Sequence, residues 1–265
     1  MFVVQRRPRD REAAAGVLIV PPFADEMNRS RRMFTLLAES LAGRGFLVML
    51  PDFLGTGDSE GEFVEASWEA WRAQLVACIG HLREATGRDD YSVVALRSGA
   101  LLAAGVLDEG DVPRPRSLVL WQPVIDGDDF LGRFLRMRLA AEMLASGERV
   151  TTQVLREQLA RGESVDVAGY ELPPALAEGM ASARLAEMRP SVADRTLWLD
   201  VVSRPGTPRQ AARSQLAAAW AEDGLALECE VVSGSPFWNS QEIVENRALV
   251  GRTADFLEQA HGLGG

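Results

Sequence analysis

A short apolar strand runs directly into a buried helix in the stretch Tyr91-Ser-Val-Val-Ala-Leu-Arg-Ser-Gly-Ala-Leu-Leu-Ala103. The run 91–96 is rich in valine and short enough for a strand buried on both faces of a parallel sheet. The segment 98–107 has the apolar composition of a buried helix. A single residue separates the two, so the chain is expected to bend sharply between strand and helix.

Outward from this bend, short apolar runs alternate with longer amphipathic segments, which is typical of a mostly parallel sheet flanked by helices. The expected strands are 17–20, 46–50, 91–96, 117–124, 196–202 and 227–232, and the expected helices are 31–43, 67–86, 98–107, 210–222 and 242–261. Ser67 is the expected N-cap of helix 67–86. Residues 262–265 are expected to form a frayed tail.

Helix follows helix between 126 and 189, with no convincing strand. We therefore expect a single α/β core formed by residues 1–125 and 191–265, with a helical cap inserted at 126–190. A chain of 265 residues with 47% hydrophobic residues is long enough for one such core.

Composition excludes several kinds of chemistry. All 28 basic residues are arginine, so Schiff-base chemistry, a Walker A lysine and a Ser-Lys dyad are excluded. The formal net charge of -10 and the lack of a long basic run argue against nucleic acid as a partner. The only histidines are His81, expected in a surface helix, and His261, expected in the tail, and no metal signature or cofactor motif is present.

Two further features bear on the compartment. Cys78 and Cys229 lie far apart in apolar surroundings and are expected to be buried free thiols, which suits the cytoplasm. Arginines at 6, 7, 9 and 11 precede an apolar run at 13–24 and imitate a signal peptide, but the run fits a buried strand and its loop better. No stretch approaches the roughly 20 apolar residues of a membrane span.

The turn-rich segment Pro51-Asp-Phe-Leu-Gly-Thr-Gly-Asp-Ser59 follows the second strand and matches the P-D-x-x-G-x-G-x-S pattern of many α/β-hydrolases. In this segment Asp52 and Asp58 are expected to hold the glycine turn together. Four separated motifs resemble the exosortase A system-associated hydrolases, type 2: Pro22-Phe-Ala-Asp-Glu-Met-Asn-Arg-Ser-Arg-Arg-Met33, Leu96-Arg-Ser-Gly-Ala-Leu-Leu-Ala103, Trp121-Gln-Pro-Val124 and Pro236-Phe-Trp-Asn-Ser-Gln-Glu-Ile243.

This resemblance covers nearly the whole chain and implies the α/β-hydrolase fold in a setting of exopolysaccharide production and protein sorting. The family's hydrolase label comes from its fold. The resemblance does not assign a reaction residue by residue.

An active hydrolase of this fold carries its nucleophile on the bend, flanked two positions away by small residues. The small pair here is Ala95 and Gly99, which puts Arg97 at the apex, and the resemblance points the same way. The alternative alignment puts Ser98 at the apex and Leu96 at a position that tolerates little beyond glycine or alanine.

The other members of a Ser-His-Asp triad are not matched. The acid is expected after strand 196–202, where the chain reads Ser203-Arg-Pro205, and the histidine after strand 227–232, where it reads Ser233-Gly-Ser-Pro-Phe-Trp-Asn239. A serine without a general base is a poor nucleophile. The candidates for an unusual mechanism are Ser98 and the acids Asp126 and Asp128.

A guanidinium at the bend would favour a carboxylate, phosphate or sulfate, with N–H groups of the Phe23–Ala24 loop aimed into the same cleft. Alternatively, Arg97 pairs with Asp25, Glu26 or Asp126 and braces the loops. Asn28 could instead cap the first helix, and Arg32 could simply be solvated. The candidate ligand-binding residues are Phe23, Ala24, Glu26, Asn28, Arg31, Arg97, Ser98, Trp121, Gln122 and Trp238.

Two functional classes follow from these residues. One is an esterase or thioesterase acting on an acyl or anionic small molecule. The other is a catalytically silent binding or scaffold protein of the same pathway.

Overall fold

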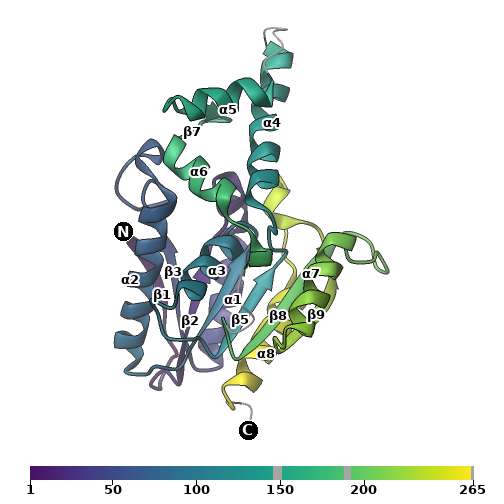
Figure 1. The fold of residues 1–265 in the computed structure, drawn as a ribbon. Coiled ribbons are helices and arrows are strands. Elements are labelled where there is room, and N and C mark those ends of the chain that lie inside the picture. Colours follow the sequence, from purple (N-terminus) through teal and green to yellow (C-terminus); the bar gives the residue numbers. More distant parts are fainter. Residues whose placement is uncertain (146–150, 188–191, 264–265) are drawn as a thin grey trace.

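The computed structural model describes residues 1–145, 151–187 and 192–263. Its centre is a seven-stranded sheet in the order β1-β3-β2-β4-β5-β8-β9, in which every neighbouring pair is parallel except β1 with β3 (Figure 1). The strands are β1 (Phe2–Arg6), β2 (Ala15–Val20), β3 (Phe46–Asp52), β4 (Tyr91–Leu96), β5 (Ser117–Trp121), β8 (Arg195–Val202) and β9 (Leu227–Ser233).

Helices cover both faces of the sheet, because alternate residues of each buried strand point to opposite sides. One face packs against α1 (Asp25–Gly43) and α8 (Arg247–Ala260), through strand residues such as Val94 and Leu199. The other face packs against α2 (Trp68–Thr86), α3 (Gly99–Glu109) and α7 (Ala211–Glu222), through residues such as Val93 and Trp198. This is the mostly parallel, helix-flanked sheet that the sequence predicts.

A cap of mixed structure follows β5. It consists of α4 (Gly127–Ala145), α5 (Thr152–Ala160), the strands β6 (Val165–Val167) and β7 (Tyr170–Leu172), α6 (Pro174–Ser182) and the short helix η2 (Leu185–Glu187). Figure 1 shows these elements above the carboxyl ends of the parallel strands. The expectation of no strand in the cap is wrong: β6 and β7 form a hairpin of three-residue strands, too short to show a period of two. The expected boundary at 190/191 lies outside the described residues.

Several other elements differ from the expected ranges. β1 was not expected because its apolar run is only three residues long and ends in Gln5 and Arg6, a composition that an exposed edge strand tolerates. α1 begins at Asp25, six residues earlier than expected, with the acidic pair Asp25 and Glu26 in its first turn, where the helix dipole favours negative charge. β5 ends at Trp121. The expected cap at Ser67 is confirmed, since its side chain accepts from the N–H of Ala70.

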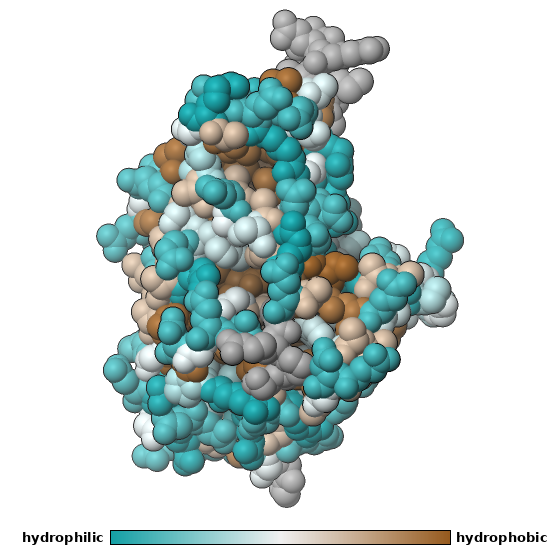
Figure 2. Space-filling model, in the orientation of Figure 1, coloured by the Kyte–Doolittle hydropathy of each residue, from teal (hydrophilic) through white to brown (hydrophobic). Residues whose placement is uncertain are grey.

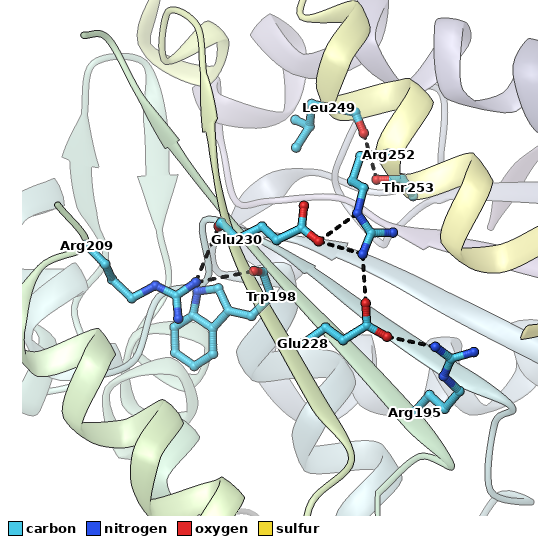
Figure 3. Close-up of polar contacts among 8 residues, drawn as sticks. All are labelled: Arg195, Trp198, Arg209, Glu228, Glu230, Leu249, Arg252 and Thr253. Atoms are coloured by element: carbon cyan, nitrogen blue, oxygen red, sulfur yellow. Dashed lines mark hydrogen bonds and ion pairs between the residues drawn. The ribbon is translucent and has the colours of Figure 1, made fainter. Parts of the chain in front are cut away.

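Arginine side chains of β8 and α8 form ion pairs with the glutamates of the edge strand β9 (Figure 3). Arg252 of α8 donates to Glu230 at 2.6 Å and to Glu228 at 2.8 Å, and Arg195 of β8 donates to Glu228 at 2.7 Å. Cys229, between the two glutamates, is exposed because no strand covers this edge, so its expected burial is wrong. Cys78 is a buried free thiol, as expected.

Within the described residues, no helix combines the length and the apolar character needed to cross a membrane.

The side chain of His261, which was expected to lie in the tail, is buried. It ends α8, shares a 2.8 Å hydrogen bond between its Nε2 and Ser92 Oγ, and its side chain is 1% exposed. Burial lowers the pKa of His261 below its ordinary 6.5, and Arg116 acts in the same direction, whereas Asp90, 3.5 Å from Nδ1, opposes the shift.

Acid is therefore expected to destabilise the fold through His261. Between its lowered folded-state pKa and 6.5, the unfolded chain binds more protons at this residue than the folded chain. The free energy of unfolding should then fall as the pH drops below 6.5, with a slope of up to about 1.4 kcal/mol per pH unit. Urea unfolding of His261→Gln should lack this component, whereas the exposed control His81→Gln should keep it. Equal slopes in all three proteins would contradict the prediction.

Candidate functional site

The bend after β4 places Arg97 at its apex. Arg97 has φ 55°, a left-handed conformation that non-glycine residues rarely adopt, and Ser98 is already helical at φ -67°. Hydrogen bonds fix the bend, because Arg97 N donates to Trp121 O and Val124 N donates to Arg97 O, both at 3.0 Å. A Cβ on Gly99 would lie 2.5 Å from the carbonyl oxygen of Pro21. The apex of the bend is therefore Arg97 and not Ser98, and Gly99 is the small residue that this arrangement requires.

Ser98 lies behind the bend and not in the cleft. Its residue is 3% exposed, and its Oγ accepts a hydrogen bond of 2.9 Å from the N–H of Phe23. Among the described residues, no imidazole or carboxylate is hydrogen-bonded to this hydroxyl. The same bond also occupies the Phe23 N–H, which was expected to point into the cleft as a donor.

Arg97 is paired with Glu26 from the first turn of α1. Its Nε lies 3.2 Å from both carboxylate oxygens of Glu26, and its Nη2 lies 3.0 Å from Oε1. The guanidinium carbon lies 5.5 Å from the ring centre of Trp238 and 5.8 Å from that of Phe130. The pairing alternative considered from the sequence is thus realised with Glu26, in a largely apolar setting.

Burial of the charged carboxylate of Glu26 is energetically unfavourable. Burial raises the pKa of Glu26, while the Arg97 charge and, more weakly, that of Arg133 act to lower it. The residue before the helix, Ala24, has φ 51°, another left-handed conformation, and this turn delivers the first residues of α1 to the cleft.

A cavity of about 200 Å³ opens beside the ion pair. Its walls combine aromatic and charged side chains from the loop after β2, the first turn of α1, the bend, the loop after β9 and the cap helix α4: Phe23, Ala24, Asp25, Glu26, Arg97, Phe130, Arg133, Phe134, Met137, Trp238 and Asn239. Phe23 and Phe134 meet edge to face with ring centres 4.7 Å apart. Figure 2 shows apolar surface in the hollows between the cap and the core.

Arg133 lies on the exposed side of this cavity. Its Nε donates to the carbonyl oxygen of Asp129 within the same helix, and no carboxylate of the described residues forms an ion pair with it. Of the two arginines that line the cavity, Arg97 is paired with a carboxylate of the described residues and Arg133 is not.

Different residues occupy the places where a hydrolase of this fold carries its acid and histidine. The loop after β8 has no acid, but Asp200 within β8 is 2% exposed and bonded to Arg209 at 2.5 Å and Arg213 at 2.7 Å. The loop after β9 presents Trp238 and Asn239 to the cavity. No group of three or more possible metal ligands occurs in 1–145, 151–187 and 192–263.

Several expected site residues have other roles. Trp121 is fully buried and donates from Nε1 to Thr253 Oγ1 in the core, so it does not line the cavity. The side chain of Gln122 accepts from Val201 N and joins β5 to β8. Asp126 pairs with Arg184 and accepts from Asp129 N at the start of α4, which makes it a structural residue of the cap. Asp128 pairs with Arg156.

Two further expected ligand residues lie outside the cavity. Asn28 does not cap α1 but donates to the hydroxyl of Tyr170 in the cap, at 3.0 Å. Arg31 pairs with Asp52, which also accepts from Asp58 N and so holds the glycine turn as expected. Arg32, which could have been merely solvated, pairs with Glu245.

The sequence predicts a pocket beneath the helical cap, but the cap residues that line the cavity and Asp200 were not among the expected site residues. The aromatic side of α4 could have been recognised from the sequence, because Phe130, Phe134 and Met137 recur at helical spacing. Asp200 interrupts an apolar strand, which could have marked a buried ion pair.

A second concavity of about 510 Å³ lies at the other end of α1, lined by Arg6, Arg7, Arg9, Arg11, Glu39, Ala42 and Gly43. It shares no residue with the cavity at the bend.

No protein-family model matches the sequence, and no curated protein does either. Solved structures do match. Est1E from Butyrivibrio proteoclasticus with bound ferulic acid has a TM-score of 0.68 at 14% identity over 98% of this chain and 94% of that one. MenH from S. aureus has a TM-score of 0.61 at 12% identity over 97% and 98%. A malate-bound esterase from Thermogutta terrifontis has a TM-score of 0.58 at 19% identity over 98% and 94%.

At these identities the similarity establishes the fold alone. The chain has the α/β-hydrolase fold that its sequence predicts. The more specific resemblance to exosortase-associated hydrolases stays a prediction.

The hydroxyl of Ser98 is expected to matter for stability. Ser98→Ala leaves the buried N–H of Phe23 without an acceptor, which typically costs about 1–3 kcal/mol. Urea denaturation should show this loss, and the control Ser182→Ala, at an exposed helix end, should change stability by less than about 0.5 kcal/mol. An unchanged midpoint for Ser98→Ala would contradict the structural role.

Proposed function

We propose that this protein binds a small acyl or aromatic molecule with an anionic group in the cavity at the bend, and that it does not perform Ser-His-Asp hydrolysis. The observation that carries the proposal is the Arg97–Glu26 ion pair at the apex where the fold requires a nucleophile. A guanidinium cannot attack an ester carbonyl, since it remains protonated at any physiological pH.

The surrounding residues support the absence of hydrolysis. Ser98 is the nearest hydroxyl in sequence, but its Oγ is buried behind the bend and bonded to a backbone N–H. Trp238, in the loop that would carry a catalytic histidine, packs on the guanidinium of Arg97. Without an imidazole to take its proton, a serine hydroxyl remains a weak nucleophile at neutral pH.

The walls of the cavity support an amphipathic ligand. Phe23, Phe130, Phe134 and Trp238 can bury one ring or a short acyl chain, and Arg97 and Arg133 offer positive charge at the same place. Two solved structures of similar fold contain carboxylic acids, ferulic acid in Est1E and malate in the Thermogutta terrifontis esterase. An aromatic monocarboxylate is therefore a suitable first probe.

The resemblance to exosortase-associated hydrolases supports a role in exopolysaccharide-related metabolism, and the free thiols suit the cytoplasm. In that setting the protein would carry or sense an acyl or aryl acid, and its cap would control access to the cavity.

Purified protein is expected to hydrolyse p-nitrophenyl acetate, p-nitrophenyl butyrate and an acyl thioester no faster than buffer. In the same preparation, ferulate and octanoate should raise the melting temperature in a saturable way, because a ligand that binds only the folded state stabilises it.

Ser98→Ala separates the two functional classes. Ester hydrolysis by the parent protein that this substitution abolishes would overturn the proposal in favour of an esterase. If neither ferulate nor octanoate raised the melting temperature, the proposed ligand site would be contradicted.

A further inference from the structure

More positive than negative charge is buried around the bend. Arg97 and Glu26 form one pair, with side chains 14% and 16% exposed. Asp200 is shared by Arg209 and Arg213, with side chains 3%, 10% and 8% exposed. Three guanidinium groups thus face two carboxylates in a largely desolvated region.

The two groups of charges are coupled. Burial lowers the pKa of Arg213, Asp200 opposes that shift, and the positive charges of Arg97 and Arg209 add to it. Arg209 is held in place by carbonyl oxygens of Trp198 and Glu230 and lies over the Trp198 ring (Figure 3). An additional negative charge near Arg97 would be stabilised by this excess, since Coulomb interactions are strong where water is excluded.

The face of Arg97 that meets the cavity is already covered by a carboxylate of the protein itself. Glu26 and Arg97 both line the cavity, and Glu26 contributes the same chemical group that an acidic ligand would bring. Burial disfavours the charged form of Glu26, so this residue is held on Arg97 at a cost.

A second cation is available to Glu26. Arg133 lines the same cavity, acts on Glu26 electrostatically and has no carboxylate partner among the described residues. It lies on the exposed side of the site, where a charged carboxylate is better solvated.

We propose that Glu26 occupies the place of the ligand's carboxylate: an aryl or acyl monocarboxylate enters the cavity, takes the guanidinium of Arg97, and displaces Glu26 to Arg133. This inference rests on the proposed function and narrows its ligand to a monoanion with an apolar body. The aromatic walls hold that body, and the charge excess near Arg97 holds the carboxylate. No covalent step is involved.

The exchange makes Glu26 a competitor of the ligand. Glu26→Gln removes the competing charge and keeps the size of the side chain, so the dissociation constant of ferulate, measured by titration calorimetry, should fall at least tenfold. The amide of ferulic acid, which has no charge, should bind weakly to the parent protein and gain less from the substitution.

Substitution of the exposed Arg133 provides a second test of the exchange. Arg133→Gln should weaken ferulate binding severalfold when Glu26 is present, because displaced Glu26 then loses its partner. In the Glu26→Gln background the same substitution should have little effect. The matched control Arg136→Gln, an exposed arginine of the same helix outside the cavity lining, should change neither value.

The outcomes separate the inference from the proposed function. Ferulate binding that is unchanged or weaker in Glu26→Gln, or unaffected by Arg133→Gln, would overturn the carboxylate exchange while leaving the ligand site intact. Absence of saturable binding of ferulate and octanoate to every variant would overturn both. Should Glu26→Gln not fold, Glu26→Ala takes its place in the same comparison with Arg133→Gln.

Discussion

The ion pair between Arg97 and Glu26 is the interaction on which the site depends. The bend after β4 directs its apex side chain toward the cleft, because the neighbouring positions are occupied by close backbone contacts. A guanidinium in that place needs a carboxylate, since an unpaired buried charge is unfavourable by several kcal/mol. Glu26 supplies it from the first turn of α1, which follows directly on Ala24 with its positive φ.

This pair also changes what the fold can do. In an active α/β-hydrolase the same position offers a hydroxyl to a substrate carbonyl, whereas here it offers a charged hydrogen-bond donor. Trp238 and Phe130 enclose the guanidinium with ring faces, which strengthens its attraction to an anion by excluding water. The bend of the fold is retained, and Arg97 stands at its apex beside Glu26.

The cap and the core meet at this site. α4 supplies Phe130, Arg133 and Phe134 to the cavity, and Asn28 of α1 binds Tyr170 of the β6–β7 hairpin. Movement of the cap would therefore alter the apolar walls and the place of Arg133 together. Asp200 and its two arginines leave a net positive charge near the carboxyl end of β8.

The sequence by itself determined the alternation of strands and helices and the sharp bend after strand 91–96, and it favoured Arg97 over Ser98 at the apex, because these depend on local periodicity and on residue identity at fixed spacing. Tertiary structure decided which carboxylate pairs with Arg97, that Trp121 belongs to the core, that Gln122 bonds to β8, that the side chain of His261 is buried, and that α4 lines the cavity. These features join residues far apart in the chain, and a local sequence pattern does not predict which distant side chains come into contact when the sheet and its helices pack.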